Sequence, residues 1–433
     1  MAAFVVNRIL KSREHVKTQA LILFCFICMT GLLSGCASGR MSKNVAYLYS
    51  GKSVIPEVKI KTHYAGNDTV VVYMGISSNA IAFDQNQTAR FGVLLRLYYN
   101  KNGKTDELAD SAYLLLTAAK NETEFTILTH SLHVAPGNNY LLQVYAVEES
   151  NRKGYRGEAG IWRKTPYNEQ DEQNYLFTNA HTGEVIFDTY VRQGTQLRVN
   201  YRNQTYANFT VQYFVPVPYM APPPFTALKE APLPAKPDSL FTTTAYLTLN
   251  RQGMYFIQAD TNKMAGISIV CTDAAYPKLT TAPDLIEALR YITRNEEYTQ
   301  MLKAPNPKAA VDDFWLARAG SADRGRILIK EYYGRVQRAN QFFTTFREGW
   351  KTDRGIIYIV YGIPDALYKL PDAETWVYYI KGTQNKLQFD FQRQDLIFTN
   401  QNYRLIRDPF YESSWQNAVY EWRNGIISNT NAN

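Results

Sequence analysis

Short strand-length segments separated by turn residues fill residues 43–280, and this pattern constrains the fold more than any other feature. Thr69–Met74, Gly92–Tyr98 and Tyr140–Val147 are rich in β-branched and aromatic residues, which favour strands. Glu57–His63 alternates between apolar and polar side chains, the pattern of a half-buried strand. The 32 Tyr and 21 Phe among 433 residues fit a β-rich chain. Strands at regular spacing with turns between them predict β-sandwiches.

We predict two tandem β-sandwich modules, residues 43–165 and residues 166–279. The stretch Leu132–Tyr145 is similar to the penultimate strand of immunoglobulin-like or fibronectin-like modules, which implies an immunoglobulin-like type. Residues 149–165 are polar and contain several Gly and Arg, so we expect a linker there.

A proline-rich segment, residues 216–237, interrupts the second module with eight of the 18 prolines of the chain. Proline fixes φ and lacks an N–H donor, which excludes a central strand. The segment is either an extended arm that docks on a partner or a long inter-strand loop packed on its own domain.

Near residue 280 the pattern changes from strand to helix. Thr281, Pro283 and Asp284 form a helix start signal. Two further helices are expected at residues 310–319 and 324–346, where apolar residues recur along one helical face.

Strand-like segments follow these helices at Ile356–Tyr361, Glu374–Ile380, Leu387–Phe391 and Leu396–Phe398. The first has no polar face, so we predict a strand covered on both sides. Helices followed by strands predict an α+β domain with an antiparallel sheet over residues 280–433. The predicted fold class is therefore multidomain, with two β-sandwich modules and this C-terminal α+β domain.

The N-terminus has the pattern of a secretory signal peptide. Residues 8–17 are basic, and residues 20–33 form an apolar run of 14 residues. Such a run is too short to span a bilayer comfortably and fits the apolar region of a signal peptide.

The sequence Leu33-Ser34-Gly35-Cys36 follows directly and resembles the lipobox of bacterial lipoproteins. The resemblance implies a signal peptide over residues 1–35 that is cleaved after Gly35, acylation of Cys36 with chains such as palmitate, and a lipidated tether over residues 36–42. Several acyl chains suffice for stable anchoring. Ala37, in place of the Asp that retains lipoproteins at the inner membrane, implies an outer-membrane protein that faces the periplasm. The alternative is an ordinary signal peptide followed by an incidental cysteine.

The cysteine count fits this interpretation. Cys25 and Cys28 lie in the segment expected to be removed, and Cys36 would carry lipid, so Cys271 alone remains. This excludes an intrachain disulfide and a four-cysteine zinc site. We expect Cys271 to be a small buried hydrophobe.

The charge balance excludes a nucleic-acid-binding protein. There are 47 Lys and Arg against 39 Asp and Glu, a net charge of +8, and no basic run.

A motif rich in glycine and tryptophan lies between the predicted helices and strands of the C-terminal domain. It comprises Gly349-Trp350-Lys351-Thr352-Asp353-Arg354-Gly355, Gly362-Ile363-Pro364-Asp365 and Glu374-Thr375-Trp376. Residues and spacing resemble the GWxTD-domain family over about 150 residues, from Pro283 to the C-terminus. The family occurs in bacterial lipoproteins and cell-envelope proteins, often after immunoglobulin-like modules. The resemblance implies an architecture and no settled activity.

The motif has two interpretations. In the structural one, Asp353 caps a turn, Gly355 supplies a positive φ and Trp350 anchors the turn on the core. In the functional one, six residues line one pocket for a sugar, peptide or peptidoglycan fragment. These are Trp350, Asp353, Arg354, Asp365, Glu374 and Trp376.

Residues 281–433 contain no His and no Cys, which excludes a Ser-His-Asp triad, a Cys-His pair and a His-ligated zinc within that domain. The histidines of the β modules are expected at the surface: His63, His130, His133 and His181. We expect no metal and no cofactor. Paired carboxylates remain, Asp353 with Asp365 or Glu374, as acid and base on a glycan.

The leading hypothesis is a non-enzymatic envelope lipoprotein that scaffolds or binds a periplasmic protein or glycan partner through its C-terminal domain. The alternative is a carboxylate-based enzyme that acts on peptidoglycan or another envelope glycan.

Overall fold

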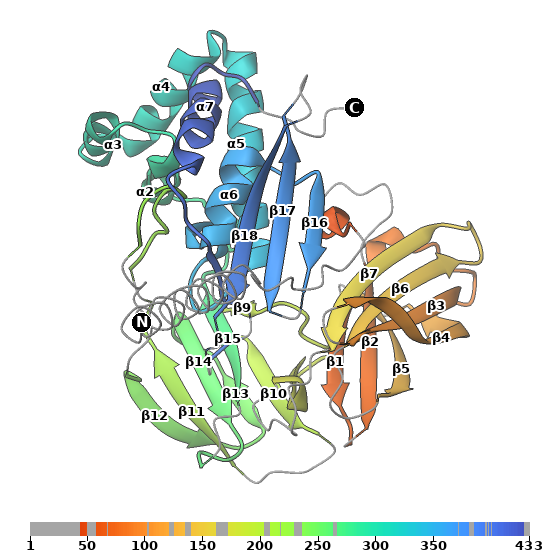
Figure 1. Ribbon diagram of the computed structural model, residues 1–433. Coiled ribbons are helices and arrows are strands. Elements are labelled where there is room, and N and C mark those ends of the chain that lie inside the picture. The colour runs from red at the N-terminus through yellow and green to blue at the C-terminus, as the bar shows by residue number, and fades with distance from the viewer. Residues whose placement is uncertain are drawn as a thin grey trace, which may run out of the picture.

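The computed structural model describes residues 44–49, 58–66, 68–101, 104–120, 125–134, 140–161, 172–202, 208–216, 218–228, 236–262, 266–370, 372–380, 385–394, 396, 398–399 and 401–427. Gly35, Cys36 and the rest of the predicted signal peptide and tether lie outside the described residues. Three parts are visible in Figure 1: a red-to-yellow β module, a yellow-green β module beside it, and a blue-green domain of helices and strands above both.

The first β module consists of two sheets that share one apolar core. One sheet has the order β1-β2-β5 and the other the order β4-β3-β6-β7. The strands are β1 (Lys59–Tyr64), β2 (Thr69–Ser77), β3 (Thr88–Lys101), β4 (Lys104–Ala119), β5 (Phe125–His133), β6 (Tyr140–Glu148) and β7 (Gly154–Ile161). Val72 from the first sheet and Phe91 and Leu142 from the second lie in the same buried cluster. Alternating inward residues thus bury both sheets against each other.

The predicted linker at residues 149–165 is wrong for residues 154–161. These residues form β7, which pairs antiparallel with β6 from Tyr140↔Ile161 to Val147↔Gly154. Polar and glycine-rich composition therefore marked the edge strand of this sheet.

The second β module also has two sheets, and these share a core that includes the buried Cys271. Their orders are β13-β10-β8 and β12-β11-β14-β15-β9, in which only the β15–β9 pair is parallel among the described strands. The strands are β8 (Tyr175–Asn179), β9 (Tyr190–Arg192), β10 (Gln196–Tyr201), β11 (Phe209–Phe214), β12 (Ser239–Thr243), β13 (Tyr246–Thr248), β14 (Gly253–Gln258) and β15 (Ile267–Thr272).

The C-terminal domain is an α+β domain, with an antiparallel sheet of order β16-β17-β18-β19 packed against helices (Figure 1). The helices are α2 (Ala282–Ala288), α3 (Asn295–Leu302), α4 (Pro307–Ala319), α5 (Ala322–Phe343), α6 (Asp353–Tyr361) and α7 (Tyr411–Arg423). The strands are β16 (Ala366–Lys369), β17 (Ala373–Tyr379), β18 (Lys386–Arg393) and β19 (Tyr403–Leu405). The predicted start signal is confirmed, because the Thr281 hydroxyl accepts a hydrogen bond from the Asp284 N–H at the start of α2.

The predicted strand at Ile356–Tyr361 is wrong, because these residues belong to helix α6. Every residue of α6 is buried, so the helix lacks the polar face by which an amphipathic helix is recognised. A short apolar run has the same pattern in a buried strand and a buried helix. Of the predicted strand at Leu396–Phe398 the structure describes the two end residues, and Leu396 forms an isolated bridge with Thr399.

The first described residues, 44–49, pack on the C-terminal domain and not on the first β module, in which we had placed them. The Val45 N–H donates to the Leu367 carbonyl at 2.9 Å, and the Asn44 amide donates to the Asp365 carbonyl at 2.8 Å. The turn η1 (Ala46–Tyr49) therefore lies beside β16 (Figure 1). Val45, Ala46 and Tyr49 are part of the buried core of the C-terminal domain.

The described part of the proline-rich segment also lies on the C-terminal domain. It connects β11 to β12, as a long inter-strand loop does. The Ala221 N–H donates to the Lys351 carbonyl at 3.0 Å, and Arg407 donates to the Pro222 carbonyl at 2.9 Å. The described part of the loop thus packs on the C-terminal domain, which neither interpretation from the sequence anticipated.

Candidate functional site

Trp350 is a buried anchor between the helices of the C-terminal domain. Its side chain is fully buried, and its indole N–H donates to Glu348 Oε2 at 2.8 Å. Its backbone N–H donates to Asn340 Oδ1 at 3.1 Å. Gly349, just before it, permits this packing because a Cβ there would lie 2.1 Å from the Ala339 carbonyl oxygen of α5.

Thr352, and not Asp353, is the residue that caps the local turn. Its hydroxyl accepts from the Gly355 N–H at 3.1 Å and donates to the Gly349 carbonyl at 2.7 Å. This makes it the N-cap of α6. Gly355 has no positive φ, contrary to our expectation. It is required for close approach, because a Cβ there would lie 2.1 Å from the Gly349 carbonyl oxygen.

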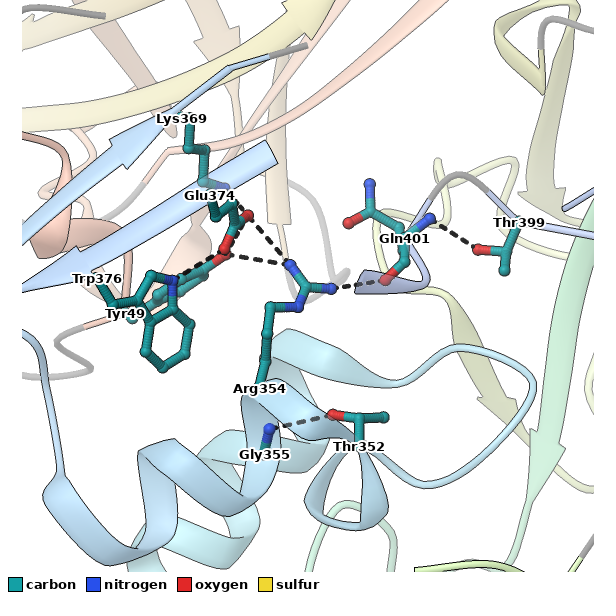
Figure 2. A network of polar contacts seen from close by, with 9 residues as sticks. All are labelled: Tyr49, Thr352, Arg354, Gly355, Lys369, Glu374, Trp376, Thr399 and Gln401. Atoms are coloured by element: carbon teal, nitrogen blue, oxygen red, sulfur yellow. Dashed lines mark hydrogen bonds and ion pairs between the residues drawn. The ribbon is translucent and has the colours of Figure 1, made fainter. Parts of the chain in front are cut away.

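Arg354 and Glu374 form a buried ion pair at the centre of the domain (Figure 2). Arg354 Nη1 lies 3.1 Å from Glu374 Oε1, and the two side chains are 2% and 1% exposed. Arg354 also donates to the Gln401 carbonyl at 2.7 Å. The indole N–H of Trp376 donates to Glu374 Oε2 at 3.0 Å. Both oxygens of the carboxylate are therefore occupied.

Two further residues complete this network, and the sequence analysis identified neither of them. The Tyr49 hydroxyl donates to Glu374 Oε1 at 3.0 Å, and Lys369 Nζ lies 3.5 Å from the same oxygen. Figure 2 shows the polar ends of Tyr49, Trp376 and Arg354 all directed at the Glu374 carboxylate. No local signal marks Tyr49, because 325 residues separate it from Glu374.

The network keeps Glu374 ionised. Burial alone would raise the pKa of Glu374, but Lys369, Arg354 and the hydrogen bonds from Trp376 and Tyr49 outweigh burial and lower it. The pKa of Tyr49 is raised, first by burial and then by the Glu374 charge. A carboxylate that stays charged and fully bonded serves as a structural centre rather than as a general acid.

Asp353 takes part in a second ion pair, with Arg407. Oδ1 of Asp353 accepts from Arg407 Nη2, and both side chains are 7% exposed. Oδ2 accepts from the Leu405 N–H at 2.8 Å. Asp353 thus ties the first turn of α6 to β19 and to the residues that follow it.

Gly362, Pro364 and Asp365 form the connection from α6 to β16. Gly362 ends the helix with a φ of 85°, a conformation that glycine adopts without strain. Pro364 is buried. Asp365 Oδ2 accepts from the Tyr379 N–H at 2.7 Å, so this carboxylate fastens the start of β16 to the end of β17.

The six residues of the functional interpretation therefore do not line one pocket. Arg354, Glu374 and Trp376 meet in the buried network, and Asp353 belongs to the separate pair with Arg407. Trp350 and Asp365 have other partners again. The structural interpretation describes Trp350 correctly and the roles of Asp353 and Gly355 incorrectly.

A cavity of about 180 Å³ lies on the Asp353 side of the motif. Residues of the motif, of the proline-rich loop and of the segment around β19 line it: Tyr219, Leu228, Arg347, Thr352, Asp353, Gln394, Leu396, Asn402, Tyr403 and Arg404. The sequence analysis identified only Thr352 and Asp353 among them.

The described residues offer no metal site, and one histidine lies deeper than expected. His63 is buried, contrary to our expectation of a surface residue. Among the described residues no three His, Cys, Asp or Glu side chains form a group that could hold a metal ion. No helix within the described ranges is long and apolar enough to cross a membrane.

Residues 253–424 match the family model of the GWxTD domain. The match begins in β14 and so includes the last two strands of the second β module. A small buried cluster, Phe214, Met254, Phe256 and Phe346, joins that module to the C-terminal domain.

Comparison with other proteins adds distant similarity only. No curated protein sequence matches the chain. A crystal structure of red sea bream transglutaminase aligns with 51% of this chain and 32% of its own, at 11% identity and a TM-score of 0.19. A calcium-binding mutant of Bacteroides uniformis beta-glucuronidase 2 aligns with 34% of this chain and 15% of its own, at 10% identity and a TM-score of 0.16. The aligned parts span about a third of those proteins or less.

Proposed function

We propose that the protein is a non-enzymatic lipoprotein of the bacterial cell envelope, anchored in the outer membrane through Cys36 and facing the periplasm. Its C-terminal domain is the recognition unit for a protein or glycan partner. The two β modules, immunoglobulin-like in our interpretation, act as spacers.

One observation carries the non-enzymatic part of this proposal: the carboxylates of the motif are occupied by internal partners. Asp353 is bonded to Arg407 and the Leu405 N–H. Glu374 is bonded to Arg354, Tyr49 and Trp376 with 1% of its side chain exposed. A glycosidase needs two carboxyl groups about 5–9.5 Å apart on either side of the scissile bond. This argues against the alternative, a carboxylate-based enzyme acting on peptidoglycan or another envelope glycan.

The docked segment 44–49 supports a position of the C-terminal domain close to the membrane. Asn44 lies eight residues after Cys36, and eight extended residues reach at most about 28 Å. A lipid on Cys36 would therefore hold the domain within a few nanometres of the bilayer surface.

The lipid anchor is tested by Cys36→Ser. We expect the variant to move from the membrane fraction to the soluble fraction, because it lacks the acylated side chain. Cys28→Ser is the matched control and should stay in the membrane fraction, since Cys28 lies in the segment expected to be removed. A Cys36→Ser protein that is cleaved after Gly35, as judged by mass, and yet fully membrane-bound would contradict the proposal.

The enzymatic alternative is tested on purified peptidoglycan. We expect the protein to release no soluble fragments, and crosslinking in the native envelope to recover a stable partner. Release of fragments that Asp353→Asn abolishes would favour the enzyme instead.

A further inference from the structure

The cavity beside the motif carries an excess of positive charge. Arg347 and Arg404 line it together with one carboxylate, that of Asp353. Asp353 is already paired with Arg407. Among the described residues, Arg404 therefore adds a positive charge that the Asp353–Arg407 pair does not offset, beside a space of about 180 Å³.

Both lining arginines are held in place by contacts with neighbouring residues. The guanidinium of Arg347 lies over the rings of Tyr219 and Phe346, at 4.4 Å from each centroid. Arg404 donates to the Leu228 carbonyl at 3.3 Å and has no ion pair within the described residues. Burial lowers the pKa of Arg347, which indicates that its charge lacks full solvation.

A third polar group, the Tyr219 hydroxyl, also belongs to the cavity lining. This oxygen is buried and has no hydrogen-bond partner within the described residues, an arrangement that costs free energy when nothing binds there. The pKa of Tyr219 is raised, first by burial and then by the Asp353 charge. The hydroxyl therefore remains a donor at neutral pH.

The start of α6 adds to the positive potential. Thr352 and Asp353, its N-cap and first residue, both line the cavity. The N-terminal end of a helix attracts anions. Leu228 and Leu396 complete the lining with apolar surface, which strengthens electrostatic interactions by excluding water.

We infer that this cavity binds a compact oxyanion group, a carboxylate or a phosphate, with Arg404 and the Tyr219 hydroxyl as its donors. The inference rests on the proposed role of the C-terminal domain as a recognition unit and gives the chemistry of what it recognises. The proline-rich loop supplies Tyr219 and Leu228, so the second β module helps to build the site.

Thermal unfolding of the whole chain in detergent tests the inference. Sodium phosphate and sodium acetate are titrated separately, against sodium chloride of equal ionic strength. A ligand that binds only the folded state raises the Tm saturably, and we expect this for at least one of the two anions. A response to phosphate indicates a phosphate-bearing ligand, a response to acetate indicates a carboxylate, and equal responses indicate recognition of charge alone.

Two variants and a matched control make the test specific. Arg404→Gln should weaken binding about ten- to hundredfold, as expected for one charge-assisted hydrogen bond. Tyr219→Phe should weaken it about three- to tenfold and leave the Tm of the anion-free protein unchanged or higher, because the hydroxyl has no partner to lose. Arg324→Gln is the control: Arg324 is also half-buried and also donates to a backbone carbonyl, that of Gly425.

The inference is overturned if neither anion gives a saturable rise in Tm, or if Arg404→Gln binds as tightly as the wild type and Arg324→Gln. These outcomes leave the lipid anchor untouched, because membrane fractionation tests the anchor independently.

Discussion

At the scale of single residues, the charged side chains of the motif stabilise the fold only as complete pairs. Burying an ion removes its hydration, and the attraction between partners offsets that cost only when the geometry and remaining hydrogen bonds are satisfied. Glu374 meets this condition through Arg354, Lys369, Tyr49 and Trp376. Removing one charge of this buried network should therefore lower the free energy of unfolding far more than removing a charge at the surface.

Glu374→Gln tests this directly. The variant keeps the shape of the side chain but leaves Arg354 and Lys369 without a buried counter-charge, so we expect a loss of about 3–5 kcal/mol in the free energy of unfolding. Asp323→Asn is the control, because Asp323 pairs with Arg326 at 90% and 76% side-chain exposure. It should cost less than about 1 kcal/mol. Chemical denaturation measures the loss of unfolding free energy in both variants. Similar losses would contradict the structural role of Glu374.

His63 makes stability depend on pH. Burial, only partly opposed by the hydrogen bond to the Asn174 carbonyl, lowers the pKa of His63 from 6.5 to about 4. Between these values the unfolded chain binds a proton that the folded chain does not, so stability falls as the pH falls through this window. The full difference corresponds to about 3 kcal/mol.

We expect His63→Gln to remove this acid dependence between pH 6.5 and 4. His181→Gln, at an exposed histidine, should retain it. Denaturation curves over this pH range would measure both. If the unfolding free energy of His63→Gln depended on pH as steeply as that of the wild type, other groups would be responsible for the acid dependence.

At the scale of elements, the close packing of α6 on its neighbours depends on two glycines, because a Cβ at either position would collide with the backbone. Gly349 lets the turn before α6 contact α5, and Gly355 lets the first turn of α6 contact Gly349. Protein interiors leave little space for an added methyl group. In this chain the motif therefore requires glycine at both positions for packing rather than for backbone conformation.

Gly355→Ala should destabilise the protein by about 1–3 kcal/mol or more, since the added Cβ would lie 2.1 Å from a carbonyl oxygen. Gly334→Ala is the matched control within α5. Its Cβ would lie 3.5 Å from the end of the Arg338 side chain, and alanine is the better helix former by up to about 1 kcal/mol. Thermal unfolding should thus show opposite signs for the two variants, and a neutral Gly355→Ala would contradict the packing argument.

At the scale of the whole molecule, distant segments complete the C-terminal core. Tyr49 packs against Phe343 and Trp376, with ring centroids 4.9 and 5.5 Å away, and Ala221 of the proline-rich loop is also part of that core. We expected a domain boundary near residue 280. A fragment that begins at Thr281 would lack Tyr49 and Ala221, so it should be less stable than the same domain in the full chain.

Tyr49→Ala tests this dependence in the full chain. We expect a loss of about 3–5 kcal/mol, typical of removing a large buried aromatic side chain. The loss should be confined to the C-terminal domain, so hydrogen exchange should accelerate in α5, α6 and β17 and stay unchanged in β3 and β6. Tyr113→Ala, at a tyrosine that is 67% exposed, should change neither the free energy of unfolding nor the hydrogen exchange of these elements. If hydrogen exchange accelerated equally in all parts of the chain, or in none, residues 44–49 would not belong specifically to the C-terminal domain.

The sequence by itself determined the β-rich modules followed by an α+β domain, the cap at Thr281 and the anchoring role of Trp350. These features depend on local propensity and on patterns within a few residues. The tertiary structure alone decided that Ile356–Tyr361 is a helix, because a run buried on all sides has no distinguishing period. It also decided that Tyr49 reaches Glu374 and that Tyr219 closes a cavity beside Asp353. Such partners lie more than a hundred residues apart in the sequence, and only the packing of whole elements brings them together.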